Sequence, residues 1–460
     1  MNEESCQADI CIIGAGVAGA AMACSLAGSG KQVCVVEKDW KEPDRIVGEL
    51  LQPDGIEQLA EMGLKPMLEG YDAQDIIGYT IIHSHRPIHI DYPGSKTGKG
   101  MRNGKFIQKM RSAFSAGDNI RCFEAEAKSL IRNKDGGVAG VECSGKTGGS
   151  FAIQADLTIV ADGIFSSFRK QLVRGTGEVT GYFLGFLLKG CSLPFEGRGH
   201  VFLTDPSPFL CYPISGDEIR FLVDFPKGKP PKRGGELVRY LNERVRSRIP
   251  EGMHAAFDAC MEEGAFKAMP NHYLPSKAVP ADGILVLGDA LNMRHPLTGG
   301  GMTVCLRDVN TCAGLLRSME IATPQQRLAL ARKFYGSRTQ NTVVNVLADA
   351  LYNVMGNQKL RDACFHYLAE GGKQAEESIA LLSGLDKRRV SLLKHFVSLA
   401  AKSGWGGIKR QRSLSSATDA YHLTGEAYRI ISPLLQNELK SKPLQAGLGL
   451  AGTLFKSKAS

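Results

Sequence analysis

Short, continuous apolar runs divide the first two thirds of the chain, and each ends at a glycine or an acidic residue. They occupy residues 9–13, 32–36, 156–161 and 285–287. Runs of this length, bounded by turn residues, are typical of strands buried on both faces of a parallel sheet. Ligands bind outside the carboxyl ends of such strands, so the residues that follow these runs are predicted to converge on one site.

The rest of the pattern predicts helices and a second sheet. Small residues at 20–27 and a periodic segment at 302–316 predict one helix each, and residues 323–355 predict one or two amphipathic helices. Between about 180 and 275, short alternating runs are separated by Pro and Gly, which predicts an antiparallel sheet with a substrate pocket.

The first strand, turn and helix carry a dinucleotide-binding fingerprint. Gly14, Gly16 and Gly19 follow the first apolar run, and the second run ends at Glu37. The first glycine makes the turn, the second lets a pyrophosphate approach the helix N-terminus, and the third allows helix and strand to pack closely. Glu37 can accept ribose hydroxyls and disfavours a 2′-phosphate, which predicts FAD or NAD rather than NADP.

Two later stretches distinguish between these cofactors. Asp162 ends the third run and Asp289 the fourth, each beside a glycine, and a proline and three glycines follow within residues 296–301. Such glycines let the backbone come close to a ligand, and the helix predicted to begin at Met302 directs free N–H groups toward it. With the fingerprint, these stretches resemble the three-part signature of the flavoprotein hydroxylase group, which implies FAD.

The spacing of these stretches predicts a discontinuous cofactor domain in an α/β fold. Residues 1–175 and 280–322 are expected to form a Rossmann-like FAD-binding domain. Residues 176–279 are expected to form an antiparallel β-sheet substrate domain, and residues 323–460 a C-terminal helical, membrane-associating region.

Three stretches are specific enough to indicate a family. Residues 41–53, Tyr79 with the glycine before it, and residues 293–303 resemble the squalene monooxygenase (squalene epoxidase) family. The resemblance covers nearly the whole chain. It fails at two points: the N-terminal hydrophobic extension of animal members is absent, and Asp54 stands where the family's Gln-Pro is usually followed by glycine.

The resemblance implies a set of site residues. The family's active-site tyrosine corresponds to Tyr79. Together with the fingerprint and the later stretches, the resemblance predicts that the cofactor is bound by Gly14, Gly16, Val17, Ala18, Gly19, Glu37, Lys38, Arg45, Leu50, Arg111, Ala127, Asp162, Asp289, Gly301 and Met302.

Ordinary structural roles are the alternatives for several of these residues. Arg45 and Arg111 would otherwise form surface salt bridges, and Tyr79 would be a core aromatic residue with a satisfied hydroxyl. His295 is expected to be structural rather than a general base. Epoxidation asks little acid–base chemistry of the protein, because the flavin carries the oxygen chemistry.

The resemblance implies FAD-dependent epoxidation of squalene to (S)-2,3-oxidosqualene with O2, in sterol or triterpenoid biosynthesis. Electrons would come from NADPH. Since FAD uses the single dinucleotide fingerprint, an NADPH-dependent diflavin reductase is expected as the electron donor. The alternatives are a geranylgeranyl-reductase-like flavoprotein that acts on isoprenoid alkenes, and an inactive FAD-containing lipid-binding protein.

The cysteines indicate the redox compartment of the protein, and the distribution of charge sets the tail apart from the rest of the chain. The 12 cysteines of the 460 residues include no Cys-x-x-Cys pair, which argues for a reducing compartment and against a disulfide framework or a metal site. The net charge of +9 is uneven: from Lys387 to the end, 13 Lys/Arg stand against 3 Asp/Glu, a balance of +10, which leaves −1 for the rest. No nucleic-acid partner is predicted.

The tail alternates these cations with apolar blocks such as residues 392–393, 430–431, 434–435 and 444–455. None reaches the roughly 20 residues of a spanning helix. Apolar anchors with cations suit an anionic leaflet, so monotopic attachment to a membrane surface through the C-terminus is expected. The surface would be the endoplasmic reticulum in a eukaryote or the cytoplasmic face of the inner membrane in a bacterium. A solvated helical bundle is the alternative.

Overall fold

The structure is a computed structural model that describes residues 6–146, 148–175, 177–226, 228–232, 234–396 and 398. The predicted membrane-associating region from residue 399 onward, including the apolar blocks at 430–431, 434–435 and 444–455, lies outside the described residues.

The first sheet contains the four strands predicted from the apolar runs. Its parallel strands follow the order β8-β2-β1-β10-β16. Their bounds are Ile120–Arg132 for β8, Val33–Glu37 for β2, Cys6–Ile13 for β1, Ser150–Val160 for β10 and Ile284–Val286 for β16. β9 (Val138–Gly145) pairs antiparallel with the outer parts of the long strands β8 and β10.

Helices pack on this sheet through small and aliphatic side chains. α1 (Val17–Leu26) lies between α3 (Asn103–Ser115) and α7 (Gly301–Ser318), and α2 (Pro53–Glu61) lies on α7. Alanines and Met22 make α1 fully buried over most of its length, which allows this close packing. A small sheet, β3 (Leu50–Leu51), β7 (Gly98–Gly100) and β4 (Gln74–Ile76), lies beside α2.

The second sheet has the order β15-β11-β14-β13-β12-β5-β6 and is antiparallel except where β12 pairs with β5. Its strands are β15 (Lys267–Tyr273), β11 (Glu178–Lys189), β14 (Glu218–Phe225), β13 (Phe209–Pro213), β12 (Arg198–Phe202), β5 (Gly78–His83) and β6 (Arg86–Asp91). α5 (Gly235–Leu241) and α6 (His254–Glu263) cover one face through a phenylalanine-rich core.

The sheet boundaries differ from the predicted division in one respect. β5 and β6 belong to the second sheet, although their residues fall within the range assigned to the cofactor domain. The cause is the parallel pairing of β5 with β12, which joins segments more than 100 residues apart and leaves no mark in the local pattern.

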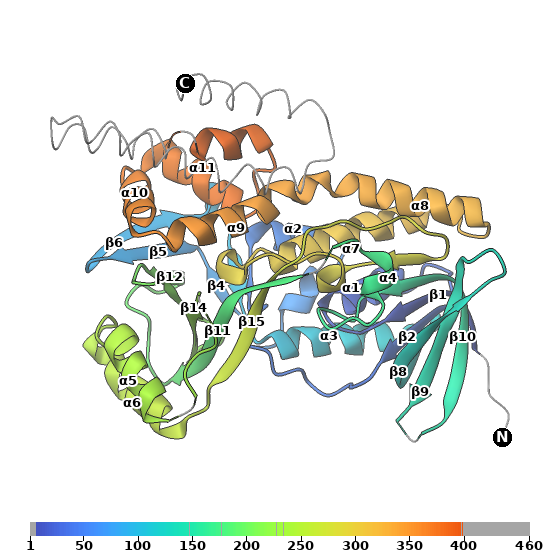
Figure 1. Cartoon of the computed structure of the whole chain (residues 1–460), viewed down its shortest axis with the longest axis horizontal. Helices are drawn as coiled ribbons and strands as arrows, with labels where there is room; N and C mark the ends of the chain where they lie inside the picture. The colour runs from blue at the N-terminus through green and yellow to red at the C-terminus, as the bar shows by residue number, and fades with distance from the viewer. Residues whose placement is uncertain are drawn as a thin grey trace, which may run out of the picture.

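The amphipathic segment at 323–355 forms two helices, as predicted. α8 (Pro324–Ser337) packs on the first sheet, where the Tyr335 hydroxyl accepts a hydrogen bond from the N–H of Val286 at 3.0 Å. α8 therefore belongs with the cofactor domain rather than with the tail. α9 (Thr342–Met355), α10 (Gln358–Ala369) and α11 (Gly372–Leu382) lie together over β5 and β6 (Figure 1). Among the described residues, no helix has the length and hydropathy needed to cross a bilayer.

Candidate active site

The three fingerprint glycines have the local geometry that their roles require. Gly14 has φ +93°, and a Cβ there would lie 2.7 Å from the carbonyl oxygen of Ala161. A Cβ on Gly19 would collide with the carbonyl oxygen of Gly14, because α1 crosses the turn so closely. Gly16 has no atom within 4 Å of its Cβ position, so the space in front of the α1 N-terminus is open.

Glu37 is held at the end of β2 beside this turn. Its carboxylate accepts hydrogen bonds from the N–H groups of Ala15 at 2.7 Å and Asp39 at 3.1 Å. Arg111 from α3 lies 3.4 Å away and donates to the carbonyl oxygens of Ala15, Asp39 and Lys41. Arg111 is thus buried beneath the loop, as a brace that fixes the position of Glu37. It does not form a surface salt bridge.

Asp162 and Asp289 flank the same helix N-terminus. A Cβ on Gly14 would lie 2.8 Å from the Cα of Asp162, and one on Gly288 would lie 3.0 Å from the Cβ of Ala18. The sheet therefore brings together the three stretches that are separated by up to 270 residues in sequence, because β10 lies between β1 and β16.

Both carboxylates lie in surroundings that disfavour their charged forms. Burial raises the pKa of Asp162, and Ser166, Arg169 and Lys38 partly offset this. Asp289 is exposed, but the protein around it still raises its pKa by desolvation, with Arg294, Arg45 and His272 acting in the opposite direction. Arg45 therefore lies near enough to Asp289 for its charge to lower the pKa of that carboxyl.

The glycine-rich loop before α7 is fixed by side chains on both sides. Buried Arg294 donates to Asn292 Oδ1 at 2.9 Å and to the carbonyl oxygen of Gly301 at 3.3 Å. His295 accepts a hydrogen bond from the N–H of Leu297 at 3.2 Å and so caps η6 (Pro296–Thr298). His295 is therefore structural, as expected from the sequence. Burial lowers its pKa to about 3, which keeps the ring neutral.

The other predicted cofactor residues border these groups. Val17 and Ala18 begin α1, Lys38 directly follows β2, and Ala127 lies in β8 beyond the part that pairs with β2. Leu50, from β3, lies against Gly299, and Met302, the second residue of α7, lies beside Gly48.

These residues fit FAD on two structural grounds. The open space at Gly16, in front of free N–H groups of α1, suits a pyrophosphate. Asp162 Oδ1 is buried without a hydrogen-bond partner among the described residues, and a buried polar atom of this kind calls for a ligand or water. Glu37 and Asp289 supply acceptors on either side.

A largely apolar cavity lies between the second sheet and the helices above it. The space within it is about 1100 Å³, its open mouth included. Its lining comes from β5, β6, β12, η6, α9, α10, α11 and residues 395–396. Tyr79 and Leu297 line it where it meets the loop before α7.

Gln52 connects this cavity to the loop, and sequence reasoning did not single it out. The fully buried Gln52 amide donates to the Thr298 carbonyl oxygen at 2.7 Å and to the Tyr79 hydroxyl at 2.6 Å, and accepts from the Tyr92 hydroxyl at 2.7 Å. Since a carbonyl oxygen can only accept, Thr298 fixes the orientation of the amide. Tyr79 is then an acceptor, and its own proton is left to donate. Burial raises the pKa of Tyr79, so the hydroxyl stays neutral. The signal for Gln52 was its place before Pro53 in a stretch that resembles the family.

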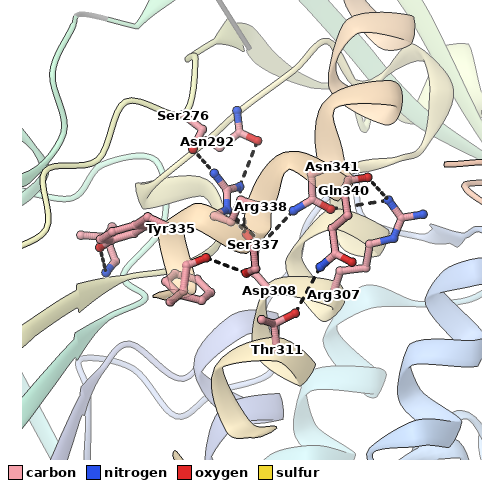
Figure 2. Close-up of polar contacts among 12 residues, drawn as sticks. Ser276, Asn292, Arg307, Asp308, Thr311, Tyr335, Ser337, Arg338, Gln340 and Asn341 are labelled. Atoms are coloured by element: carbon pink, nitrogen blue, oxygen red, sulfur yellow. Dashed lines mark hydrogen bonds and ion pairs between the residues drawn. The ribbon is translucent and has the colours of Figure 1, made fainter. Parts of the chain in front are cut away.

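A buried polar network ties α7 to the helices that wall the cavity (Figure 2). Arg338 in η7 (Arg338–Asn341) lies 2.9 Å from the carboxylate of Asp308 on α7, and Asn341 donates to the same carboxylate at 2.8 Å. The neighbouring Arg307, 1% exposed, donates to Asp54 Oδ2 at 2.7 Å. Asp54, the residue that departs from the family pattern, is therefore the partner of a buried arginine.

Two family models match the chain. The squalene epoxidase model matches residues 154–418, and a model of FAD dependent oxidoreductases matches residues 9–43.

Curated relatives match most of the chain. It is 40% identical to squalene epoxidase 2, mitochondrial, from Arabidopsis thaliana, over 94% of this chain and 76% of that protein. It is 42% identical to squalene monooxygenase SE1 from Panax ginseng, over 85% and 75%, and 38% identical to squalene monooxygenase from Mus musculus, over 94% and 78%.

Solved structures share the fold at lower identity. PqsL, a probable FAD-dependent monooxygenase from Pseudomonas aeruginosa, superposes with a TM-score of 0.65 at 21% identity, over 78% of this chain and all of that one. HpxO from Klebsiella pneumoniae, in complex with FAD and uric acid, gives 0.67 at 17% identity, over 85% and 99%. These likenesses establish the α/β fold of FAD-dependent monooxygenases.

Proposed function

The chain belongs to the squalene epoxidase family, and we propose that its apolar cavity holds squalene with one terminal alkene at the end formed by Tyr79 and Leu297. The protein is an FAD-dependent squalene monooxygenase. The observation that carries the proposal for the cavity is its lining, which is almost entirely hydrocarbon and meets the cofactor loop at one end. A polyprene offers no polar group to recognise, so shape and apolar contact must position it.

The cofactor residues have distinct proposed tasks. Gly16 and the α1 N-terminus would hold the pyrophosphate, and Glu37, braced by Arg111, would accept from the ribose. Asp289 and Arg45, with Gly301 and the N-terminus of α7, would hold the flavin end of the cofactor. Bound FAD supplies the activation of dioxygen, and the chain's own residues orient the alkene and exclude water.

Tyr79 is proposed as the residue that connects substrate to cofactor. It lines the cavity, and through Gln52 it is linked to Thr298 of the cofactor loop. A shift of this loop would therefore move Tyr79, and a shift of Tyr79 would move the loop. Its neutral hydroxyl, at the end of the cavity, limits how far the alkene can enter.

The electron donor is proposed to be a separate NADPH-dependent diflavin reductase. The support is that one fingerprint serves the chain and that its glycines and Glu37 form a single dinucleotide site. Attachment to a membrane surface through the tail is also proposed, because squalene dissolves in bilayers and the cavity is partly walled by residues 395–396, which lie within the basic tail.

A reconstituted reaction tests the proposal. FAD-loaded protein is incubated with squalene, oxygen, NADPH and a diflavin reductase, and the products are separated by mass. We expect 2,3-oxidosqualene, and negligible squalene-dependent NADPH oxidation when the reductase is omitted. A saturated product would instead indicate the reductase-like alternative. If the flavin is reduced and reoxidised but squalene is recovered unchanged, the protein would be a lipid-binding protein.

A further inference from the structure

We propose that a basic surface around Phe165, formed by α4 (Arg169–Leu172) and the segment after β15, is the docking face for an acidic protein that delivers electrons to the flavin. The inference rests on the proposed use of an external reductase, and it adds the place and the chemistry of contact.

The centre of this surface is apolar. Phe165 is 82% exposed, and Val279, on the neighbouring segment, is 38% exposed. The two segments are joined: the N–H of Val279 donates to the Leu172 carbonyl oxygen at 3.1 Å. Exposed side chains of this size on a cofactor-bearing loop suggest a contact surface, since protein interfaces place aromatic groups at their centre.

The two segments that form this surface carry cations. Residues 163–177 include Arg169, Lys170 and Arg174, and residues 268–281 include Lys277. The acidic residues that border these ranges are Asp162 in the cofactor site, the exposed Glu178, and Asp282, which is paired with Arg327 at 2.7 Å. Lys170, Arg174 and Lys277 are exposed, and the N–H of Arg174 donates to the Lys277 carbonyl oxygen at 2.8 Å, which puts these two residues side by side. An apolar centre beside mainly basic segments suits a partner of the opposite charge.

The surface lies next to both cofactor carboxylates. Arg169 donates to the Ile164 carbonyl oxygen at 3.1 Å, on the turn that follows Asp162. On the other side, the charge of Arg169 lowers the pKa of His272 and the charge of Asp289 raises it, so both residues lie near this ring. Electrons entering through this face would therefore arrive at the edge of the cofactor site, whereas α5 and α6 lie far from it (Figure 1).

A protein partner fits this surface better than a second nucleotide. Lys170, Arg174 and Lys277 are exposed on the two segments that carry the exposed Phe165 and Val279, whereas a dinucleotide site is concave and places backbone N–H groups against phosphates. An encounter steered by charge also suits repeated electron delivery, because it raises the association rate without requiring tight binding.

Charge reversal of the surface in the full-length, FAD-loaded protein tests the inference. We compare wild type, Lys170→Glu/Arg174→Glu and Phe165→Ser for the dependence of squalene epoxidation on reductase concentration. The double variant should need at least about tenfold more reductase for half-maximal rate at low salt, and should lose most of the salt dependence that wild type has. Phe165→Ser should raise the requirement without changing the salt dependence.

The matched control is a double charge reversal at two exposed cations elsewhere, Lys189→Glu at the end of β11 and Arg239→Glu on α5. It changes the net charge by the same amount and should behave as wild type. Flavin content and reoxidation after chemical reduction should be unchanged in every variant. Equal reductase dependence of wild type and the double variant, with turnover intact, would overturn the docking face. Squalene-dependent NADPH oxidation without reductase would instead overturn the proposed external donor. If the double variant then lost this oxidation, the surface would be a nucleotide site and not a protein one.

Discussion

Gly16 and Gly19 lie one turn apart, yet a side chain would act differently at each. Gly16 has φ −72° and ψ −165°, which any residue adopts, and open space at its Cβ. Gly16→Val should therefore keep the fold within about 1 kcal/mol and lower FAD affinity about 100-fold, or about 2.7 kcal/mol, by occupying the pyrophosphate site. Flavin titration and thermal unfolding of the apoprotein measure the two effects.

Gly19→Ala is the contrasting variant. Its Cβ meets the Gly14 carbonyl oxygen, so it should lower stability by at least 1–3 kcal/mol, on the order of an overpacked core. A Gly16→Val protein that retained wild-type FAD affinity would contradict the assignment of the fingerprint.

Tyr79 can act through the substrate, through Gln52, or through both. Tyr79→Phe leaves a Gln52 N–H unpaired, which should cost about 1–3 kcal/mol of stability. Tyr92→Phe leaves the other end of the same amide unpaired and so serves as a matched control. We expect similar loss of stability in both, and about tenfold lower turnover for Tyr79→Phe than for Tyr92→Phe, because Tyr79 lines the cavity. Equal turnover would mean that Tyr79 acts only through Gln52.

The junction of α7, η7 and α9 depends on a buried ion pair. Arg338→Met would leave Asp308 charged in the interior with Asn341 as its partner, and should cost about 3–5 kcal/mol. The double variant Asp308→Leu/Arg338→Met should recover most of this loss, because neither member of the pair is then left as an unpaired buried charge. Denaturant unfolding of the FAD-loaded protein measures both.

The ion pair of Arg246 and Asp258 is an exposed control for the buried pair of Arg338 and Asp308. Their side chains are 36% and 46% exposed, so Arg246→Met should cost less than about 1 kcal/mol. A loss as small at Arg338 would show that the network in Figure 2 contributes little to holding the cavity wall on α7.

His295, which caps η6, makes the free energy of unfolding depend on pH. Burial lowers the pKa of His295 to about 3, whereas an unfolded histidine titrates near 6.5. The unfolded chain therefore binds a proton first, and this contribution to stability is lost as pH falls from about 6.5 toward 3. Between pH 7 and 5 the loss amounts to about 2 kcal/mol.

His295→Asn keeps an acceptor for the Leu297 N–H but cannot titrate. Its stability deficit against wild type should shrink by about 2 kcal/mol between pH 7 and 5. The nearby Asp224, whose pKa burial raises to about 6, is stabilising at low pH and acts in the opposite direction, but it is present in both proteins. A deficit independent of pH would indicate that His295 is protonated in the folded state.

At the scale of the whole molecule, part of the tail's charge is used within the protein. Lys387 lies 3.2 Å from Asp54, and Lys394 lies 2.8 Å from Glu377. From residue 399 onward, nine Lys/Arg against three Asp/Glu leave a balance of +6 for the proposed membrane contact. Leu392 and Phe396 are buried, so a truncation that tests the anchor should keep them and end the chain after Ser398.

Truncation after Ser398 should release the protein from anionic vesicles and lower turnover on bilayer squalene far more than on detergent-dispersed squalene. Each cation near an anionic leaflet contributes about 1 kcal/mol, and apolar burial adds a part that salt does not screen. High salt should therefore weaken binding of the full chain only in part, as vesicle sedimentation would measure. Unchanged sedimentation of the truncated form would place the anchor elsewhere.

The sequence alone determined the features that depend on short stretches. The strands β1, β2, β10 and β16, the helices α1, α7, α8 and α9, and a dinucleotide site for FAD or NAD followed from apolar runs, glycine spacing and the acids after them. The choice of FAD followed from the resemblance of these stretches to the flavoprotein hydroxylase signature. These signals are local because strand burial, turn geometry and helix periodicity are properties of neighbouring residues.

The tertiary structure decided what depends on segments far apart in sequence. Pairing of β5 with β12 placed Tyr79 in the second sheet, and the fold brought Gln52, Tyr92 and Thr298 into one hydrogen-bond network. The cavity likewise exists only where that sheet meets α9–α11. A polar side chain at a buried position shows no pattern in sequence, because its partner is chosen by packing over the whole chain, and packing is what the local pattern leaves open.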